Sequence, residues 1–213
     1  MPDLRFEKKH IAAGNGPVIG IDESGRGSWA GPVTAAAFWL NPDCFGQLPS
    51  ELNDSKKVSP VKRAAIYTNL TAGEHAFSVV SIAASEIDRI GILGATFLAM
   101  QRAAKNLQDT LIRRQYAAIG LCLVDGNLDP GLEMPVKTLI KGDALSCSIA
   151  AASIIAKETR DRIMRGFARV HTDYGWDRNM GYGTKIHLEA LRVHGISEQH
   201  RRSFAPIKYF LQS

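Results

Sequence analysis

The sequence predicts an α/β fold in which helices flank a mixed β-sheet. Apolar runs rich in Val and Ile alternate with segments of helical spacing along almost all of the 213 residues, and this alternation is typical of α/β proteins. No internal repeat, low-complexity tract or linker interrupts the pattern. Since the length suffices for one domain with a substantial core, we expect a single domain over residues 1–213.

Three apolar runs in the first half of the chain are predicted to be strands. Residues 17–21 form a short run, which ends at the acidic pair Asp22-Glu23. Residues 32–40 follow a glycine-rich turn, and residues 76–83 are rich in Val and Ile. Short apolar runs bounded by turn residues are typical of buried strands.

Helices are predicted between and after these strands. Residues 41–59 are rich in Pro, Asp, Ser and Asn and are expected to form a loop. At its end, Ser59-Pro60 is typical of a helix start, because Ser caps the first turn and Pro fits the first helical position. This helix should run to about residue 70. Residues 86–115 are expected to form one long helix or two.

The second half of the chain continues the alternation. Residues 116–124 and 137–140 are apolar and are predicted to be strands. A long helix should follow over about residues 144–169. This segment is dense in Ala and Ser, which would let the helix axis lie close to a sheet. Residues 184–194 are predicted to form a shorter helix.

Composition narrows the possible protein classes. No apolar run approaches the length of a membrane span, and no apolar core follows the charges at the N-terminus, so neither a membrane protein nor a secretory signal is expected. The three scattered cysteines favour buried thiols in a reducing, cytoplasmic compartment. A net charge of +5 favours a polyanionic partner, although many basic proteins bind no nucleic acid.

Four acidic residues share a position at the end of an apolar segment: Asp22, Glu23, Asp125 and Asp143. Ligands of α/β sheets bind at the carboxyl ends of strands, so strands distant in sequence can bring these acids together. Their mutual repulsion would require divalent cations, and oxygen ligands favour Mg²⁺ or Mn²⁺ over zinc. Two such ions about 4 Å apart support in-line phosphoryl transfer.

Each acid also has a structural interpretation. Asp143 is equally consistent with an N-cap of the long helix. Asp125-Gly126 is consistent with an ordinary turn. The tandem pair Asp22-Glu23, directly after a buried strand, is harder to explain by structure alone, and the residues themselves leave these alternatives open.

The glycine-rich turn at residues 25–31 looks superficially like a dinucleotide-binding loop. That motif requires a helix after its last glycine, whereas Gly31 leads into Pro32 and a predicted strand. The glycines have another use, because without a Cβ they let backbone N–H and C=O groups approach a ligand closely. A ribose 2′-hydroxyl both donates and accepts, so exposed backbone could read it.

An ordered set of motifs resembles the ribonuclease HII family. The motifs cover nearly the whole chain in the family's order, which makes the set specific. They are GIDESGRGSWAGPV at 20–33, NDSKKV at 53–58, VDGN at 124–127, KGD at 141–143 with SIAAASIIAK at 148–157 and TRD at 159–161, GYGTK at 181–185 with His187-Leu188, and HRRSF at 200–204.

The resemblance implies a ribonuclease H-like fold, with a mixed sheet flanked by helices and a small C-terminal helical part at about 170–213 that contacts substrate. It implies that two Mg²⁺ or Mn²⁺ ions are held by the catalytic acids Asp22, Glu23, Asp125 and Asp143. It also implies a monomer that acts on RNA–DNA hybrids in DNA replication and repair.

The resemblance further implies how substrate is selected. The residues Gly25, Arg26 and Gly27 would read the 2′-hydroxyl together with Tyr182, and Lys56 would contact a substrate phosphate. The partners would be RNA–DNA hybrid duplexes and DNA duplexes that contain single ribonucleotides. Hydrolysis would leave 5′-phosphate and 3′-hydroxyl ends.

Two departures from the family pattern affect these expectations. Gly183 stands where the family usually has Pro or Ala, so we expect a looser loop around Tyr182. Gly183→Pro should then raise activity if the native backbone accepts the φ of proline. The C-terminal residues 210–213, FLQS, do not fit a clamp-binding peptide, and no longer helical extension follows the HRRSF motif.

Two basic clusters are interpreted as surface. Residues 160–165, which include Arg160, Asp161, Arg162 and Arg165, are predicted to form a solvated helix face. The segment His200-Arg201-Arg202 is also placed at the surface, where it could lie near the duplex. The six histidines show no spacing typical of zinc ligands.

Three other functions compete with this interpretation. The ribonuclease HIII family shares the paired acids, but its first motif differs and lacks Gly-Arg-Gly. A non-catalytic hybrid-binding protein would have to retain all four acids without using them. A Mg²⁺-dependent phosphatase for small molecules would have no use for the basic loop or for Tyr182.

Overall fold

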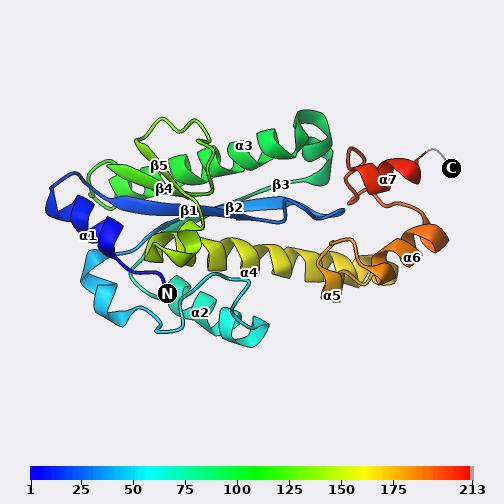
Figure 1. Ribbon diagram of the computed structural model, residues 1–213, viewed down its shortest axis with the longest axis horizontal. Coiled ribbons are helices and arrows are strands. Elements are labelled where there is room, and N and C mark those ends of the chain that lie inside the picture. Colours follow the sequence, from blue (N-terminus) through cyan, green and yellow to red (C-terminus); the bar gives the residue numbers. More distant parts are fainter. Residues whose placement is uncertain (212–213) are drawn as a thin grey trace.

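The computed structural model describes residues 1–211. A five-stranded mixed sheet lies at its centre in the order β3-β2-β1-β4-β5, and helices cover both faces (Figure 1). Strand β1 pairs antiparallel with β2 and parallel with β4. The predicted α/β fold is therefore confirmed. The strands are β1 (Val18–Ser24), β2 (Val33–Trp39), β3 (Ala76–Ile82), β4 (Leu121–Asp125) and β5 (Val136–Leu139).

The helices form the outer layers. Helix α3 packs on one face of the sheet and α4 on the other, with α2 on the far side of α4 (Figure 1). The α-helices of the described residues are α1 (Arg5–Ala12), α2 (Pro60–Ala72), α3 (Ala84–Arg113), α4 (Cys147–Val170), α5 (Trp176–Asn179), α6 (Lys185–His194) and α7 (Ala205–Tyr209), and short 3₁₀ segments occur at Pro42–Gln47, Gly142–Ala144 and Thr172–Tyr174.

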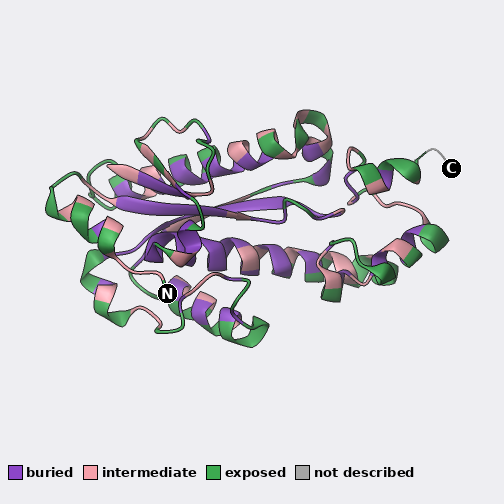
Figure 2. Cartoon of the chain, viewed as in Figure 1, coloured by how far each residue is buried: buried purple, intermediate pink, exposed green. Residues whose placement is uncertain are grey.

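Each face of the sheet has its own core. Ile19 and Ile21 of β1 pack with α3, whereas Phe38 of β2 packs with the alanines of α4. The central strands β1, β2 and β4 and the inner sides of both helices are mainly buried, whereas the edge strands β3 and β5 are only partly buried (Figure 2). A Cβ on Gly20 would overlap the backbone of Ser148, so α4 lies directly on β1. The small residues of α4 therefore let its axis lie close to the sheet, as the sequence predicted.

Local signals placed most elements correctly. The Ser59 side chain accepts a hydrogen bond from the N–H of Lys62 and caps α2, as predicted. The segment 84–113 consists of two helical pieces, because Gly91 at φ 76° breaks the helical path. The predicted strand 116–124 is too long, since Gln115 turns the chain at φ 65° and the ladder begins only at Leu121.

Helix α1 was not predicted, and a distant contact anchors it. Its buried Glu7 accepts hydrogen bonds from the hydroxyls of Ser146 and Ser148 and from the N–H of Ser148. These donors lie at the start of α4, where the free N–H groups of a helix favour an anion. The partners are about 140 residues away in the chain, so the local sequence of α1 gives no sign of this contact.

The C-terminal helices α5, α6 and α7 lie beyond the end of the sheet, where α4 extends past it (Figure 1). They surround a small core that includes Trp176 and Leu191, and Ala30 joins this core from the glycine-rich turn. Within residues 1–211, no helix is long and apolar enough to cross a membrane. The segment 210–213 is the one predicted not to fit a clamp-binding peptide. Its last two residues, Gln212 and Ser213, lie outside the described residues.

Candidate active site

Two of the predicted acids are neighbours at one edge of the sheet. Ile21 of β1 pairs with Val124 of β4 in parallel register, so Asp22 and Asp125 follow side by side near the carboxyl ends of adjacent strands. Both belong to the face that carries α4, because side chains two residues apart on a strand share a face. Asp22 is buried, and its carboxylate accepts a hydrogen bond from the N–H of Glu23 at 2.7 Å.

Asp143 reaches the same place from the 3₁₀ segment after β5. The N–H of Gly142 donates to Oδ1 of Asp125 at 2.6 Å, which ties this segment to β4. One carboxylate oxygen each of Asp22, Asp125 and Asp143 lies within 4.8 Å of the others. Ser146 caps α4, and its hydroxyl accepts from the N–H of Ile149. The capping interpretation of Asp143 is therefore wrong.

Glu23 does not belong to this three-carboxylate cluster. Strand β1 continues to Ser24, so Glu23 projects from the opposite face to Asp22 and lines a small cavity with Thr96 and Met100 of α3. Its carboxylate lies 3.4 Å from a guanidinium nitrogen of Arg26. The structure thus joins three of the four predicted ligands and places the fourth beside them.

The electrostatics of the cluster suit a cation. Burial raises the pKa of Asp22 well above its usual range, and the negative charges of Glu23 and Asp125 add to the effect. Burial, with the charges of Asp125 and Asp54, raises the pKa of Asp143 to about 6. Burial also raises the pKa of Glu23, although Arg26 opposes it. Burial and mutual repulsion destabilise the ionised forms of these carboxylates, so a bound divalent ion would stabilise them.

Divalent metal is expected to stabilise the protein, and more at pH 8 than at pH 5.5. The raised pKa of Asp143, about 6, means that protons compete with metal at the lower pH and not at the higher. In metal-free protein, the same raised pKa contributes stability that is lost as pH rises through about 6. Metal at a hundred times its Kd should add about 2.7 kcal/mol. Thermal unfolding with Mg²⁺ or Mn²⁺ at both pH values measures this.

Asp125→Asn should lose most of the metal-induced rise in Tm. Asp129→Asn is its matched control and should keep that rise. Asp129 is exposed and lies four residues further along the same loop, outside the cluster. An equal rise in Tm for both variants would mean that the metal binds elsewhere.

The predicted substrate residues all line one pocket of about 430 Å³ beside the cluster. Gly25, Arg26 and Gly27 come from the turn after β1, Lys56 from the loop before α2, and Tyr182 from the turn before α6. The pocket lies beside the three-carboxylate cluster, since the charges of the clustered acids raise the pKa of its Lys56. The other lining residues are Glu23, Ser24, Ser55, Ser153 and Lys157.

Lys56 is held where its charge faces the acids. Its N–H donates to Asp54, and the neighbouring Ser55 hydroxyl accepts from Ser153 of α4. Burial opposes the charge on Lys56, but the surrounding carboxylates outweigh it and raise its pKa. The charge of Asp54, which sequence analysis did not single out, helps to raise the pKa of Asp143, so this loop lies close to the cluster.

The interpretation of the two basic clusters as surface is largely wrong. Arg160 and Arg201 are 0% exposed, and His200 is 1% exposed. Asp161 is buried as well and pairs with Arg63 of α2 at 3.0 Å. These groups find their partners on segments distant in sequence, and local charge density cannot reveal such partners.

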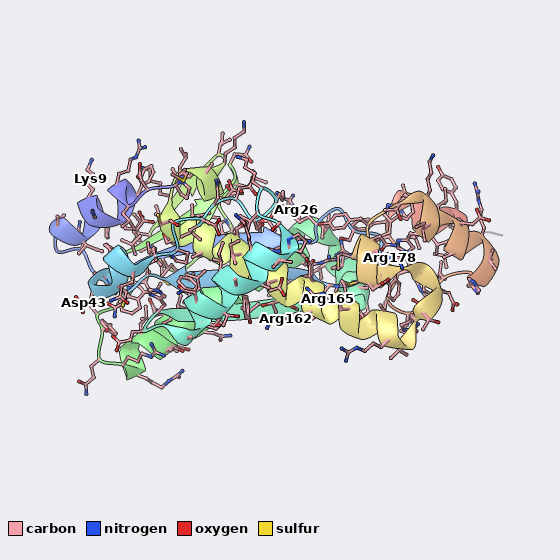
Figure 3. All side chains as sticks on the ribbon, turned by 90° about the horizontal axis from the view of Figure 1, so that it is seen from below. Lys9, Arg26, Asp43, Arg162, Arg165 and Arg178 are labelled. Atoms are coloured by element: carbon pink, nitrogen blue, oxygen red, sulfur yellow. The ribbon has the colours of Figure 1, made fainter. Side chains whose placement is uncertain are left out.

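Arg162 and Arg165 keep their predicted exposure in part. Both lie along α4, where Figure 3 labels them, and their side chains are about half exposed. Each donates a hydrogen bond to Glu158, so neither is a free surface cation.

Gly183 is closely packed, contrary to our expectation of a looser loop. Its φ is not positive, yet a Cβ at this position would overlap the indole ring of Trp29. The same ring lies 5.5 Å from the ring of His187. The bulk of Trp29 therefore occupies the space that Pro or Ala would need, and the predicted gain from Gly183→Pro is withdrawn.

Gly183→Ala is expected to lower stability by about 1–3 kcal/mol, the usual cost of overpacking, and to lower cleavage with it. Trp29→Leu should restore part of both, because a smaller side chain frees the space above residue 183. A double-mutant cycle in urea unfolding measures the coupling.

Gly166→Ala serves as the control for this cycle. Gly166 is exposed on α4, and a Cβ there meets nothing within 4 Å. It should therefore be neutral or stabilising. Additive effects of Gly183→Ala and Trp29→Leu would contradict the proposed packing.

Comparison with known proteins agrees with this geometry. Residues 19–207 match the family model described as Ribonuclease HII. A ribonuclease HII from Gluconobacter oxydans (strain 621H) is 45% identical, with 100% of this chain and 98% of that protein covered. The crystal structure of ribonuclease H2 from Pyrococcus horikoshii OT3 matches with a TM-score of 0.76 at 23% identity, over 92% of this chain and 97% of the other.

A second solved structure, Bst-RNase HIII in complex with Mn²⁺, matches with a TM-score of 0.75 at 20% identity. The match covers 93% of this chain and 70% of that one. At these identities the two structures show the ribonuclease H-like fold, whereas the family match extends to sequence over most of the chain.

Proposed function

Because the chain belongs to the ribonuclease HII family, we propose that this endoribonuclease hydrolyses the RNA strand of RNA–DNA hybrids and also cuts at single ribonucleotides embedded in duplex DNA. One observation carries the proposal. The pocket formed by the Gly-Arg-Gly turn, Lys56 and Tyr182 lies beside the cluster of Asp22, Asp125 and Asp143, whose charges act on Lys56. Carboxylates that could bind metal therefore lie close to a cation that could bind phosphate and to backbone groups that could bind a hydroxyl.

The donor set fits hard divalent cations. Asp22, Asp125 and Asp143 would hold one Mg²⁺ or Mn²⁺, and Glu23 would contribute to a second from the adjoining face. The Mn²⁺ bound by the structurally similar ribonuclease HIII supports this choice. Such ions would activate water and stabilise both oxygens of an in-line displacement, which leaves 5′-phosphate and 3′-hydroxyl ends.

The remaining residues would select and orient the substrate. Lys56 would contact a phosphate, and the backbone of residues 25–27 would bond the 2′-hydroxyl next to the cut. Tyr182 is 38% exposed and belongs to the C-terminal part, so residues from about 170 onward would contact the duplex. We further propose that the enzyme acts as a monomer, which gel filtration of the active fraction would test.

The decisive experiment uses an end-labelled DNA duplex with one ribonucleotide, incubated with Mg²⁺ or Mn²⁺ and with a chelator as control. Cleavage at the ribonucleotide, with 5′-phosphate and 3′-hydroxyl products, is expected. Binding without cleavage would favour the hybrid-binding alternative, and activity on small phosphate esters alone would favour a phosphatase. Cleavage of long hybrids alone would remove single ribonucleotides from the proposal.

Lys56→Ala is expected to weaken binding to all duplexes alike and to reduce the slope of log affinity against log salt by roughly one, since one phosphate contact is lost. The ammonium group lies among the acids, so in the free enzyme it also offsets their charge. Titrations at several salt concentrations measure the slope. Lys57→Ala, at the exposed neighbour, is the control and should change the slope little. An unchanged slope for Lys56→Ala would place Lys56 outside the interface.

A further inference from the structure

Arg201 contacts the glycine-rich turn through all three of its guanidinium nitrogens. Its Nη2 donates to the carbonyl of Gly25 at 2.7 Å and its Nη1 to the carbonyl of Arg26 at 2.9 Å. Its Nε donates to the carbonyl of Gly31 at 2.9 Å. Arg201 comes from the C-terminal part, about 175 residues further along the chain. One buried side chain thus fixes both ends of the turn.

These contacts set the direction of two backbone donors. The carbonyl and the N–H of one peptide unit point in opposite directions, because the unit is planar and trans. Arg201 holds the carbonyls of Gly25 and Arg26, so the N–H groups of Arg26 and Gly27 point away from it. Within residues 1–211, neither N–H has a protein acceptor, and both residues line the substrate pocket.

The burial of Arg201 is costly in free energy. Within the described residues it forms no ion pair with a carboxylate, and neither does the neighbouring buried Arg160. Burial, with the charge of Arg160, lowers the pKa of Arg201 to about 9. Arg160 donates in parallel to the carbonyls of Ala30, Pro32 and Met180. Six backbone carbonyls therefore take the place of a carboxylate partner for these two guanidinium groups.

The residue before Arg201 links the same segment to Tyr182. The N–H of Ser197 donates to Nδ1 of His200, so the proton of this neutral ring lies on Nε2 and is donated to Nε2 of His187. His187 then carries its proton on Nδ1 and donates it to the carbonyl of Tyr182 at 3.0 Å. Residues 200 and 201 therefore contact both the glycine-rich turn and, through His187, the backbone of Tyr182.

We propose that Arg201 is a positioning residue for ribose recognition: it aims the N–H groups of Arg26 and Gly27 at the 2′-hydroxyl of the substrate. This inference rests on the proposed function. It assigns no catalytic role to Arg201, which is enclosed by protein and does not line the pocket.

The test compares Arg201→Lys with Arg202→Lys. Lysine keeps the charge, but its three donors lie on one nitrogen and cannot reproduce the planar fork by which the guanidinium reaches three carbonyls. Arg202 is an exposed neighbour whose backbone N–H bonds Asp88, so the same change there should be silent. Affinities for a single-ribonucleotide duplex and for the same all-DNA duplex are measured in metal-free buffer, alongside kcat and KM for cleavage.

Arg201→Lys is expected to lower the ratio of ribonucleotide to all-DNA affinity by about tenfold, or about 1.4 kcal/mol, with affinity for all-DNA duplex unchanged. If Arg201 had a purely structural role, the variant would have a lower kcat because less enzyme is folded, but the affinity ratio would not change. An unchanged affinity ratio would therefore overturn the proposal. If wild-type enzyme fails to cut the ribonucleotide duplex, the proposed function fails instead.

A second measurement on wild-type protein keeps the proposal testable if Arg201→Lys does not fold. Hydrogen exchange of the Arg26 and Gly27 amides should be fast in the free protein, because neither has an acceptor. The single-ribonucleotide duplex should protect both amides, and the all-DNA duplex should not. Equal protection by the two duplexes, or none by either, would overturn the proposal.

Discussion

Asp125→Asn should lower cleavage by about a thousandfold or more, equivalent to roughly 4 kcal/mol of transition-state stabilisation. The change removes a negative charge from the three-carboxylate cluster. The fold should survive, because an Asn side-chain oxygen can still accept the hydrogen bond that Gly142 donates to Asp125. Single-turnover cleavage at saturating Mg²⁺, with circular dichroism to check folding, measures the effect.

Two further Asp→Asn variants are compared with Asp125→Asn. Asp129→Asn makes the same chemical change on the exposed part of the loop and should be silent. Asp143→Asn should reduce activity sharply, since Ser146 already caps α4 and Asp143 has no capping role to preserve. Full activity of Asp125→Asn would remove the carboxylate cluster from the mechanism.

An all-DNA duplex should be bound but cut at least about 10⁴-fold more slowly than the same duplex with one ribonucleotide. A site built to hydrogen-bond a hydroxyl rejects a substrate that lacks it, because its own polar groups are left unpaired. Binding should persist, since phosphate contacts such as that of Lys56 do not depend on the sugar. Parallel cleavage and binding assays on the two duplexes measure the discrimination.

Tyr182 should contribute to this discrimination in two parts. Tyr182→Phe removes only the hydroxyl and should cost less activity than Tyr182→Ala, which also removes the ring. The ring is held between the pocket and two cations, with Arg160 at 5.5 Å and Lys157 at 5.9 Å from its centre. Tyr67→Phe, on α2, is the control. Equal rates for all three residues at position 182 would exclude Tyr182 from the site.

Local sequence was sufficient for most of the fold and for part of the site. Buried strands show as apolar runs, and Ser59-Pro60 marks a helix start, because both signals depend on neighbours in the chain. The positions of Asp22 and Asp125 at strand ends followed in the same way, and parallel pairing of β1 with β4 brought them together. The ordered motifs added the residues of the substrate pocket.

Some assignments depended on where an element ends in space. Because β1 continues to Ser24, Asp22 and Glu23 project from opposite faces, and only Asp22 joins the cluster. Because α4 begins at Cys147, Ser146 is its cap and Asp143 is free to face the other acids. A shift of one to three residues in an element boundary decides both outcomes, and local propensity does not define boundaries that closely.

The sequence by itself determined the α/β fold, the acids at the strand ends and the family. Only the tertiary structure decided which charged groups are buried and which side chains compete for space. Arg201 is buried because three carbonyls more than 150 residues away accept its hydrogen bonds, and Gly183 is required because Trp29 fills the volume above it. The free energy of a buried charge or a packed ring depends on partners that only folding brings into contact.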